Sequence, residues 1–373
     1  MKKISLFAIK LTVFSVFLFP LLSLPIANAA TTTVRIFEPT HRQSDGRFID
    51  DDLTASLAAN GALGKLIFQP SSGSHIWQID AAILEEITAM SKGYTLLSGE
   101  APQGVAIAQS WLQQLLVVTA NAPVTALPFG NPSGYWIHRL APHDQNYFLV
   151  AGQQHLQLLL ARPVLRSANY PENKYFKLDP AITEAFKNAS ADLQLVASYL
   201  SSPQLEEIKL RSASIFAREL DPSRRDFLAR NLTSESYVLV HNIRVIPGRF
   251  TVTASKQKLP ITVVNDFLNS AKVQLRVSSL NSKVVVGEIP PLILAPKSKT
   301  QVLVPIEVLT SGSSALVIDA ISMKGDLLGD SVLFPLKLSV INPVATWITT
   351  GAGITLFVAA VIQSIRRIRR RRS

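Results

Sequence analysis

The feature that most constrains the fold is the alternation of apolar and polar side chains between residues 248 and 341. Apolar residues occupy every second position in several short runs, which is the period of a half-buried β-strand. The runs are 250–254, 259–264, 273–277, 283–288, 300–308, 315–321 and 332–340. Turn-forming Asn, Asp, Gly, Pro and Ser lie between them. Short strands at a spacing of about ten residues predict an antiparallel, immunoglobulin-like β-sandwich over residues 243–341.

Residues 166–242 predict a helical segment. Three dipeptides, Asp179-Pro180, Ser202-Pro203 and Asp221-Pro222, each place a capping side chain directly before a proline. Proline at the first helical position, after such a cap, is a strong start signal. We therefore expect three helices to begin at these points, the second extending over residues 205–220.

Residues 30–165 alternate between the two kinds of element, which predicts an α/β domain with a parallel sheet. The expected strands are 65–68, 76–79 and 124–128. The expected helices are 81–91 and 105–118. Asp80 precedes the first helix and can cap it. A ligand site in such a layer lies at the carboxyl ends of the strands, here near Asp80 and residues 129–131.

The amino terminus predicts a signal peptide over residues 1–29. Lys2 and Lys3 precede an almost wholly apolar stretch, and Ala27-Asn28-Ala29 has the small-x-small pattern of a cleavage site. We expect cleavage after Ala29. An uncleaved signal anchor is the alternative, because Lys10 interrupts the early apolar residues.

The carboxyl terminus predicts a membrane anchor. Residues 347–365 contain no charged side chain, and about 20 such residues in a helix cross a hydrocarbon layer about 30 Å thick. Trp347 has the position of an interfacial anchor, while Arg366, Arg367 and four further arginines form a basic tail over residues 366–373. The expected topology is a single-pass, type I plasma-membrane protein with an extracytoplasmic ectodomain and a cytoplasmic tail.

The net charge of +11 is a property of the two ends. Lys2, Lys3, Lys10 and the six arginines of the tail account for all but two of these charges. The folded part thus lacks the basic balance expected of a nucleic-acid binder. With no cysteine in the chain, disulfides, thiolate metal sites and cysteine nucleophiles are excluded.

Few residues carry a signal for catalysis. Asp80 is the one catalytic candidate, with Glu85 and Glu86 about one helical turn away, although a capping Asp with helix-surface glutamates is the simpler interpretation. His138 and His143 lack the spacing of a helical metal-binding pair. Phosphate-binding and dinucleotide-binding loops are also missing from the sequence, and we predict neither a metal nor another cofactor.

Aromatic residues offer a possible platform for stacking sugars, formed by Tyr135, Trp136, Trp77 and Trp111. Aromatic side chains in an α/β layer more often belong to the core, and this is the interpretation we favour.

Several strings of the sequence resemble an uncharacterised family of membrane-anchored envelope proteins of actinobacteria. The strings are 246–253, 258–266, 286–290 and 327–330 in the sandwich, and 77–84 and 126–132 upstream. The resemblance covers most of the mature chain. Members are typically longer, and their genes usually lie beside that of the peptidoglycan-precursor flippase, which implies a role in cell-wall assembly.

The amino-terminal half of that family is remotely similar to a polysaccharide-deacetylase or glycosidase barrel. Here residues 30–165 are too few for a complete barrel, which needs about 250 residues. Asn131 also stands where the family usually has an acidic residue, and an amide cannot act as a general base. The resemblance therefore implies a reduced barrel-like layer with a weakened catalytic site.

Two functions are consistent with the sequence. The first is a non-enzymatic envelope protein that supports cell-wall assembly by binding glycan or a wall-assembly membrane protein. The second is a carbohydrate-active hydrolase or deacetylase with a reduced site near Asp80. Neither the ligand nor the oligomeric state follows from the sequence.

Overall fold

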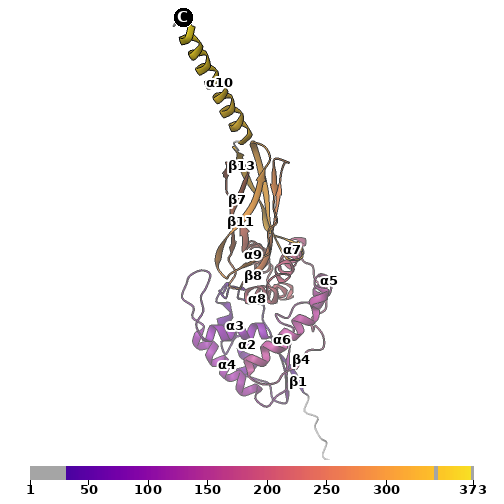
Figure 1. The fold of residues 1–373 in the computed structure, drawn as a ribbon. Helices are drawn as coiled ribbons and strands as arrows, with labels where there is room; N and C mark the ends of the chain where they lie inside the picture. The colour runs from indigo at the N-terminus through magenta and orange to yellow at the C-terminus, as the bar shows by residue number, and fades with distance from the viewer. Residues whose placement is uncertain (1–30, 340–342, 371–373) are drawn as a thin grey trace, which may run out of the picture.

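The structure, a computed structural model, describes residues 31–339 and 343–370, with side chains for 31–339 and 350–367. The predicted signal peptide and the last three residues of the tail lie outside the described residues. Figure 1 shows an α/β layer at one end, a group of helices in the middle, a β-sandwich beyond it and a single helix at the carboxyl end.

The amino-terminal sheet has four parallel strands in chain order. They are β1 (Thr32–Ile36), β2 (His75–Ile79), β3 (Val124–Ala126) and β4 (Leu165–Arg166). The prediction of an α/β layer with a parallel sheet is confirmed. Consecutive parallel strands joined through helices form the arrangement of half a (β/α)8 barrel, and we call this layer the half-barrel.

Helices pack against one face of this sheet. They are α1 (Asp52–Leu57), α2 (Ala62–Phe68), α3 (Ala81–Ser91), α4 (Val105–Thr119) and α6 (Gln145–Leu160), whereas the buried side chains of α5 (Gly134–Leu140) belong to the core of the later part of the chain. Trp77 and Ile79 point into the core that these helices share with the sheet. The opposite face carries three polar side chains in one register row, Arg35, Gln78 and Thr125, and the row ends in the exposed Leu165 of β4. This face is therefore more polar than the face that the helices cover.

One predicted strand, 65–68, is wrong, because these residues form the end of α2. Leu63 and Ile67, four residues apart, are both buried, so the helical period places them on one face. A four-residue apolar run fits a buried strand or a helical segment equally well, and tertiary packing selects the helix here.

The helices predicted after the half-barrel begin where expected. They are α7 (Pro180–Ala197), α8 (Pro203–Ser212) and α9 (Pro222–Val240). Asp179, Ser202 and Asp221 each accept a hydrogen bond from a backbone N–H of the first turn. The second helix is shorter than predicted, since it ends at Ser212 and continues as the 3-10 helix η2 (Ala213–Phe216).

The β-sandwich is confirmed, with two facing sheets ordered β10-β8-β12-β13-β6 and β5-β7-β11-β9. Its strands are β5 (Ile243–Val245), β6 (Phe250–Val252), β7 (Lys256–Asn265), β8 (Ala271–Ser279), β9 (Val284–Val286), β10 (Leu292–Leu294), β11 (Ser298–Val308), β12 (Gly312–Ile321) and β13 (Leu327–Leu338). The strands β5 and β10 were not predicted from the sequence. β13 begins five residues before the predicted start at 332.

We call α7, α8, η2 and α9 the middle helices. They share one hydrophobic core with the sandwich. Phe186 and Phe216 from the helices belong to the same buried cluster as Val263 and Phe334 from the two sheets. Only His241 and Asn242 separate α9 from β5. This part of the chain is therefore packed as a single body.

The last helix, α10, spans Pro343–Arg370 and includes the segment predicted to cross the membrane. In the described part of the chain, no helix combines the length and the apolar character needed to span a bilayer. Arg366 and Arg367 are exposed, and the side chain of Trp347 lies outside the described residues.

Candidate functional site

Asp80 lies at the carboxyl end of β2 and caps α3, as the sequence predicted. Its Oδ1 accepts hydrogen bonds from the backbone N–H groups of Ala82, at 3.0 Å, and Gly130, at 2.9 Å. The side chain is 1 % exposed, and its Oδ2 has no hydrogen-bond partner among the described residues. Burial raises the pKa of Asp80 to about 7, although the two backbone hydrogen bonds oppose this shift.

The turn after β3 brings Asn131 to the same edge of the sheet. Gly130 and Asn131 both have positive φ, 72° and 41°, so the chain turns sharply and directs the Gly130 N–H toward Asp80. The guanidinium of Arg35 donates to Oδ1 of Asn131 at 3.4 Å. The structure thus brings together the two positions that the sequence placed at the strand ends.

A segment of the middle helices covers this edge. A Cβ atom at Gly130 would lie 2.1 Å from Oγ of Ser214, so the backbone of η2 packs directly on the turn. The backbone N–H of Ser133 donates to the carbonyl of Phe216 at 2.9 Å. We call residues 211–216 the plug, because they close the strand ends where a barrel enzyme has its active site.

Arg225 of α9 holds the plug in place. Its buried guanidinium donates to the carbonyl oxygens of Ile215, Ala217 and Leu220, at 3.0, 2.8 and 2.9 Å. These carbonyls belong to η2 and to the turn between it and α9. Arg225 therefore ties this turn to α9.

An ionic cluster joins the plug to the half-barrel. Arg211 is 8 % exposed and lies 2.9 Å from Oε2 of Glu85, 3.7 Å from Oε1 of Glu86 and 2.5 Å from Oε1 of Glu207. Burial alone would lower the pKa of Arg211, but the three glutamates outweigh it and raise the pKa. Glu85 and Glu86 come from α3 and Glu207 from α8, so this cluster connects the two layers.

Glu86 is fully buried and extends the cluster into the loop after β1. It accepts a hydrogen bond from the hydroxyl of Thr40, at 2.5 Å, and one from the backbone N–H of His41, at 2.9 Å. Burial raises the pKa of Glu86, and the charge of Arg211 opposes this shift. The carboxylate of Glu86 therefore depends on partners from two separate chain segments, the loop after β1 and α8.

His41 is buried between two further carboxylates. Its Nδ1 lies 2.7 Å from Oδ1 of Asp50 and its Nε2 lies 3.3 Å from Oε1 of Glu38. Burial acts to lower the pKa of His41, but Asp50 and Glu38 raise it to about 9. Asp50 in turn accepts from Arg224 of α9 at 2.7 Å, which makes a second ionic link to the middle helices.

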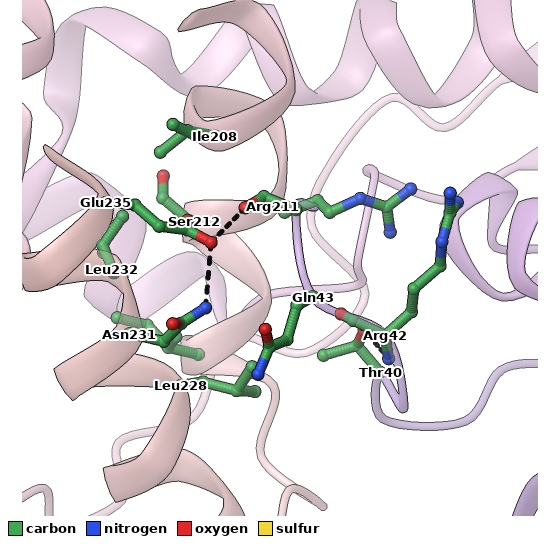
Figure 2. Close-up of a pocket in the computed structure, with 12 residues that line it drawn as sticks. Thr40, Arg42, Gln43, Ile208, Arg211, Ser212, Leu228, Asn231, Leu232 and Glu235 are labelled. Carbon is green, nitrogen blue, oxygen red and sulfur yellow. Dashed lines mark hydrogen bonds between the residues drawn. The ribbon is translucent and has the colours of Figure 1, made fainter. Parts of the chain in front are cut away.

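Two hollows adjoin the ionic cluster. Figure 2 shows the first, between residues 40–44, α8 and α9, where Glu235 accepts a hydrogen bond from Asn231. Its volume of about 30 Å³ suffices for little more than water. The second is an open groove of about 480 Å³ bounded by the turn at 42–46, α3 and α8. Arg42 and Arg211 contribute to both hollows.

Other sequence candidates lie elsewhere. Trp77, Trp111 and Trp136 are all buried, so the prediction that they belong to the core is confirmed. His138 and His143 are exposed, and the described residues contain no group of three or more His, Cys, Asp or Glu side chains arranged for a metal ion.

Arg42 and Arg211 were not among the residues predicted from the sequence. For Arg42 a signal exists, since Asp45-Gly46 is a turn dipeptide that predicts a tight hairpin at this point. For Arg211 the sequence contains no comparable signal, because its partners on α3 are more than 120 residues away.

Comparison with known proteins bears on the second half of the chain. A family model described as "Family of unknown function (DUF6049)" matches residues 150–373, which is more than half of the sequence. The chain belongs to this family. The match begins within α6 and includes the middle helices, the sandwich and α10. No curated protein matches the chain significantly.

Several solved structures are similar to a part of this DUF6049 member, at low identity. The Caenorhabditis elegans MSP family member WR4 is 12 % identical over 26 % of this chain and 96 % of its own, with a TM-score of 0.20. The PapD-like domain 7 of human CEP192 is 13 % identical over 27 % of this chain and 86 % of its own, with a TM-score of 0.21. The Escherichia coli alpha-2-macroglobulin segment from domain MG7 to the C-terminus is 13 % identical over 26 % of this chain and 16 % of its own, with a TM-score of 0.22. This chain thus covers only a small share of the macroglobulin.

Removal of the buried cation tests the ionic cluster. We expect Arg211→Ala to destabilise the protein by about 3–5 kcal/mol, because Glu86 would remain buried without its cation. Arg230→Ala removes an exposed pair with Asp226 on α9 and should change the free energy of unfolding by less than about 1 kcal/mol. Urea denaturation followed by circular dichroism measures both. Equal, small effects would show that the cluster does not stabilise the fold.

The pKa of His41 predicts a pH dependence of stability. The folded pKa, about 9, lies above the reference value of 6.5, so the charged imidazole stabilises the folded state fully below pH 6.5. This contribution should disappear as the pH rises through 9, a loss of up to about 3 kcal/mol. The difference between wild type and His41→Gln, measured by urea denaturation across this range, isolates the effect of His41 from that of Asp80. If the difference in the free energy of unfolding did not change with pH, the raised pKa of His41 would be contradicted.

Proposed function

We propose that this chain is a non-enzymatic protein of the cell envelope, which acts by binding glycan or a wall-assembly membrane protein. The observation that carries the proposal is the plug over the carboxyl ends of the half-barrel strands. Catalysis at Asp80 would require substrate to reach a side chain that is 1 % exposed. Binding requires only accessible surface, which the groove beside the plug offers.

The competing function is a hydrolase, and one observation favours it. A carboxyl group with a pKa near 7 has the protonation behaviour of a general acid. The same shift arises in any carboxyl buried without a cation, and a capping role accounts for both hydrogen bonds of Asp80. In addition, Asn131 cannot supply the second carboxylate that glycoside hydrolysis uses.

The proposed location rests on the sequence. Residues 347–365 lack charge and are followed by six arginines, the pattern of a single-pass anchor with a cytoplasmic tail. The resemblance to envelope proteins of actinobacteria adds a setting in cell-wall assembly. A type I arrangement would place the half-barrel, the middle helices and the sandwich outside the cytoplasm.

Cysteine labelling tests the proposed topology, because the natural chain has no cysteine. Lys324, in the exposed turn between β12 and β13, and Ser373, at the end of the tail, are suitable positions. We expect Lys324→Cys to react with a membrane-impermeant maleimide in intact cells. Ser373→Cys should react only after the membrane is permeabilised. Labelling of both in intact cells, or of neither, would contradict the type I anchor.

Two substitutions of Asp80 separate the structural role from the catalytic one. Asp80→Asn retains an oxygen that can accept both backbone hydrogen bonds and removes the buried charge, so stability at pH ~8 should equal or exceed that of the wild type. Asp80→Ala loses both bonds and should destabilise the protein by about 1–3 kcal/mol. Thermal denaturation measures this difference.

The cell-wall phenotype of cells that carry Asp80→Asn tests whether Asp80 is catalytic. With protein amounts matched by immunoblot, cells that carry Asp80→Asn should have the wild-type cell-wall phenotype. A null phenotype with a stable, correctly folded Asp80→Asn protein would support the hydrolase and overturn the binding proposal.

A further inference from the structure

The open groove beside the ionic cluster contains two cationic side chains without a direct ionic partner. Its volume, about 480 Å³, lies within the roughly 300–1,000 Å³ typical of small-ligand sites. The charged residues that line it are Arg42, Asp45, Glu85, Lys92, Glu207 and Arg211. Positive and negative side chains are equal in number, so what matters is which of them are already paired.

The acidic residues of the groove all have partners within the protein. Glu85 accepts from Arg211 at 2.9 Å and also pairs with His155, while Glu207 accepts from Arg211 at 2.5 Å. Asp45 pairs with Arg47, at 2.7 Å, in the same turn. Arg211 is the common partner of the two glutamates, and its charge is therefore neutralised internally.

Arg42 and Lys92 remain as the unpaired charges of the groove. Within residues 31–339, no carboxylate lies at ion-pair distance from either side chain. The one hydrogen bond from the Arg42 side chain runs from Nε to the carbonyl of Gly46, at 3.1 Å. Both terminal nitrogens of its guanidinium are thus available for a ligand.

The turn that carries Arg42 is built to hold this side chain. The Arg42 backbone forms a β-bridge with the buried Phe48, and the N–H of Gln43 donates to the carbonyl of Arg47 at 2.9 Å. Gly46 has a φ of +92°, and a Cβ there would lie 3.1 Å from Nη2 of Arg42. A glycine at this position therefore permits both the turn and the close approach of the guanidinium.

Two guanidinium groups meet at this place. Figure 2 shows those of Arg42 and Arg211 on the same side of the small cavity, pointing away from it. Burial and, secondly, the charge of Arg211 lower the pKa of Arg42, while the charges of Glu86, Glu207 and Glu85 oppose this shift. An anion bound directly to Arg42 would further stabilise its charged form, whereas a cation would destabilise it.

We propose that the groove binds the oxyanion group, a carboxylate or a phosphate, of an anionic glycan. Arg42 is the bidentate donor, since the planar guanidinium matches both kinds of oxyanion, and Lys92 supplies a second positive charge. The inference rests on the proposed binding function and names the class of its ligand. Neutral glycans lack the group that this site recognises.

Isothermal titration calorimetry of the full-length protein tests the proposal with three probes. N-acetylmuramic acid carries a carboxylate, a glycerol phosphate oligomer carries phosphates, and chitotetraose is neutral. We expect at least one anionic probe to bind, and Arg42→Gln to weaken its binding by about tenfold or more, because charge-assisted hydrogen bonds are lost. Arg230→Gln, the same change at an exposed arginine of α9 that does not line the groove, is the matched control and should bind as the wild type does.

The outcomes separate the inference from the proposed function. Equal binding of chitotetraose and the anionic probes would leave glycan binding intact but overturn the anion site. Anionic binding that survives Arg42→Gln, in a variant with the wild-type circular dichroism spectrum, would also overturn it. Binding of none of the probes would remove glycan as the ligand of the proposed function. The anionic probe that binds identifies carboxylate or phosphate as the recognised group.

Discussion

The burial of Arg211 is the interaction on which the arrangement of the molecule depends. Its guanidinium needs glutamates from α3 of the half-barrel as well as one from its own helix. A buried charge without its partner costs several kcal/mol, so neither layer is complete before the two are joined. Once they are joined, η2 lies on the turn at Gly130 and closes the strand ends. The closure of the barrel-like site is thus a consequence of how a charge is satisfied.

Local signals in the sequence predicted much of the fold. The caps at Asp80, Asp179 and Ser202 marked the helix starts correctly, because a cap and its helix are adjacent in the chain. The alternating pattern predicted the sandwich for the same reason. The errors occurred where local signals are weak. Residues 65–68 were too short to distinguish helix from strand, and β10 consists of three consecutive apolar residues, which show no alternation.

The candidate site was predictable only in part. The sequence placed Asp80 and Asn131 at neighbouring strand ends, which follows from the parallel order of the sheet. It did not reveal that Ser214 covers them, because that contact joins residues far apart in the chain. Nor did it predict the balance of charges in the groove. Arg42 stands out only when the partners of Glu85 and Glu207 are known.

The short connection between α9 and β5 has a consequence for how the protein can present a bound ligand. With two residues between these elements and a core that continues across them, there is no hinge at which the helices could swing relative to the sandwich. The groove therefore keeps a constant height and direction relative to the end of β13. The sandwich is thus a rigid spacer between the middle helices and the end of β13.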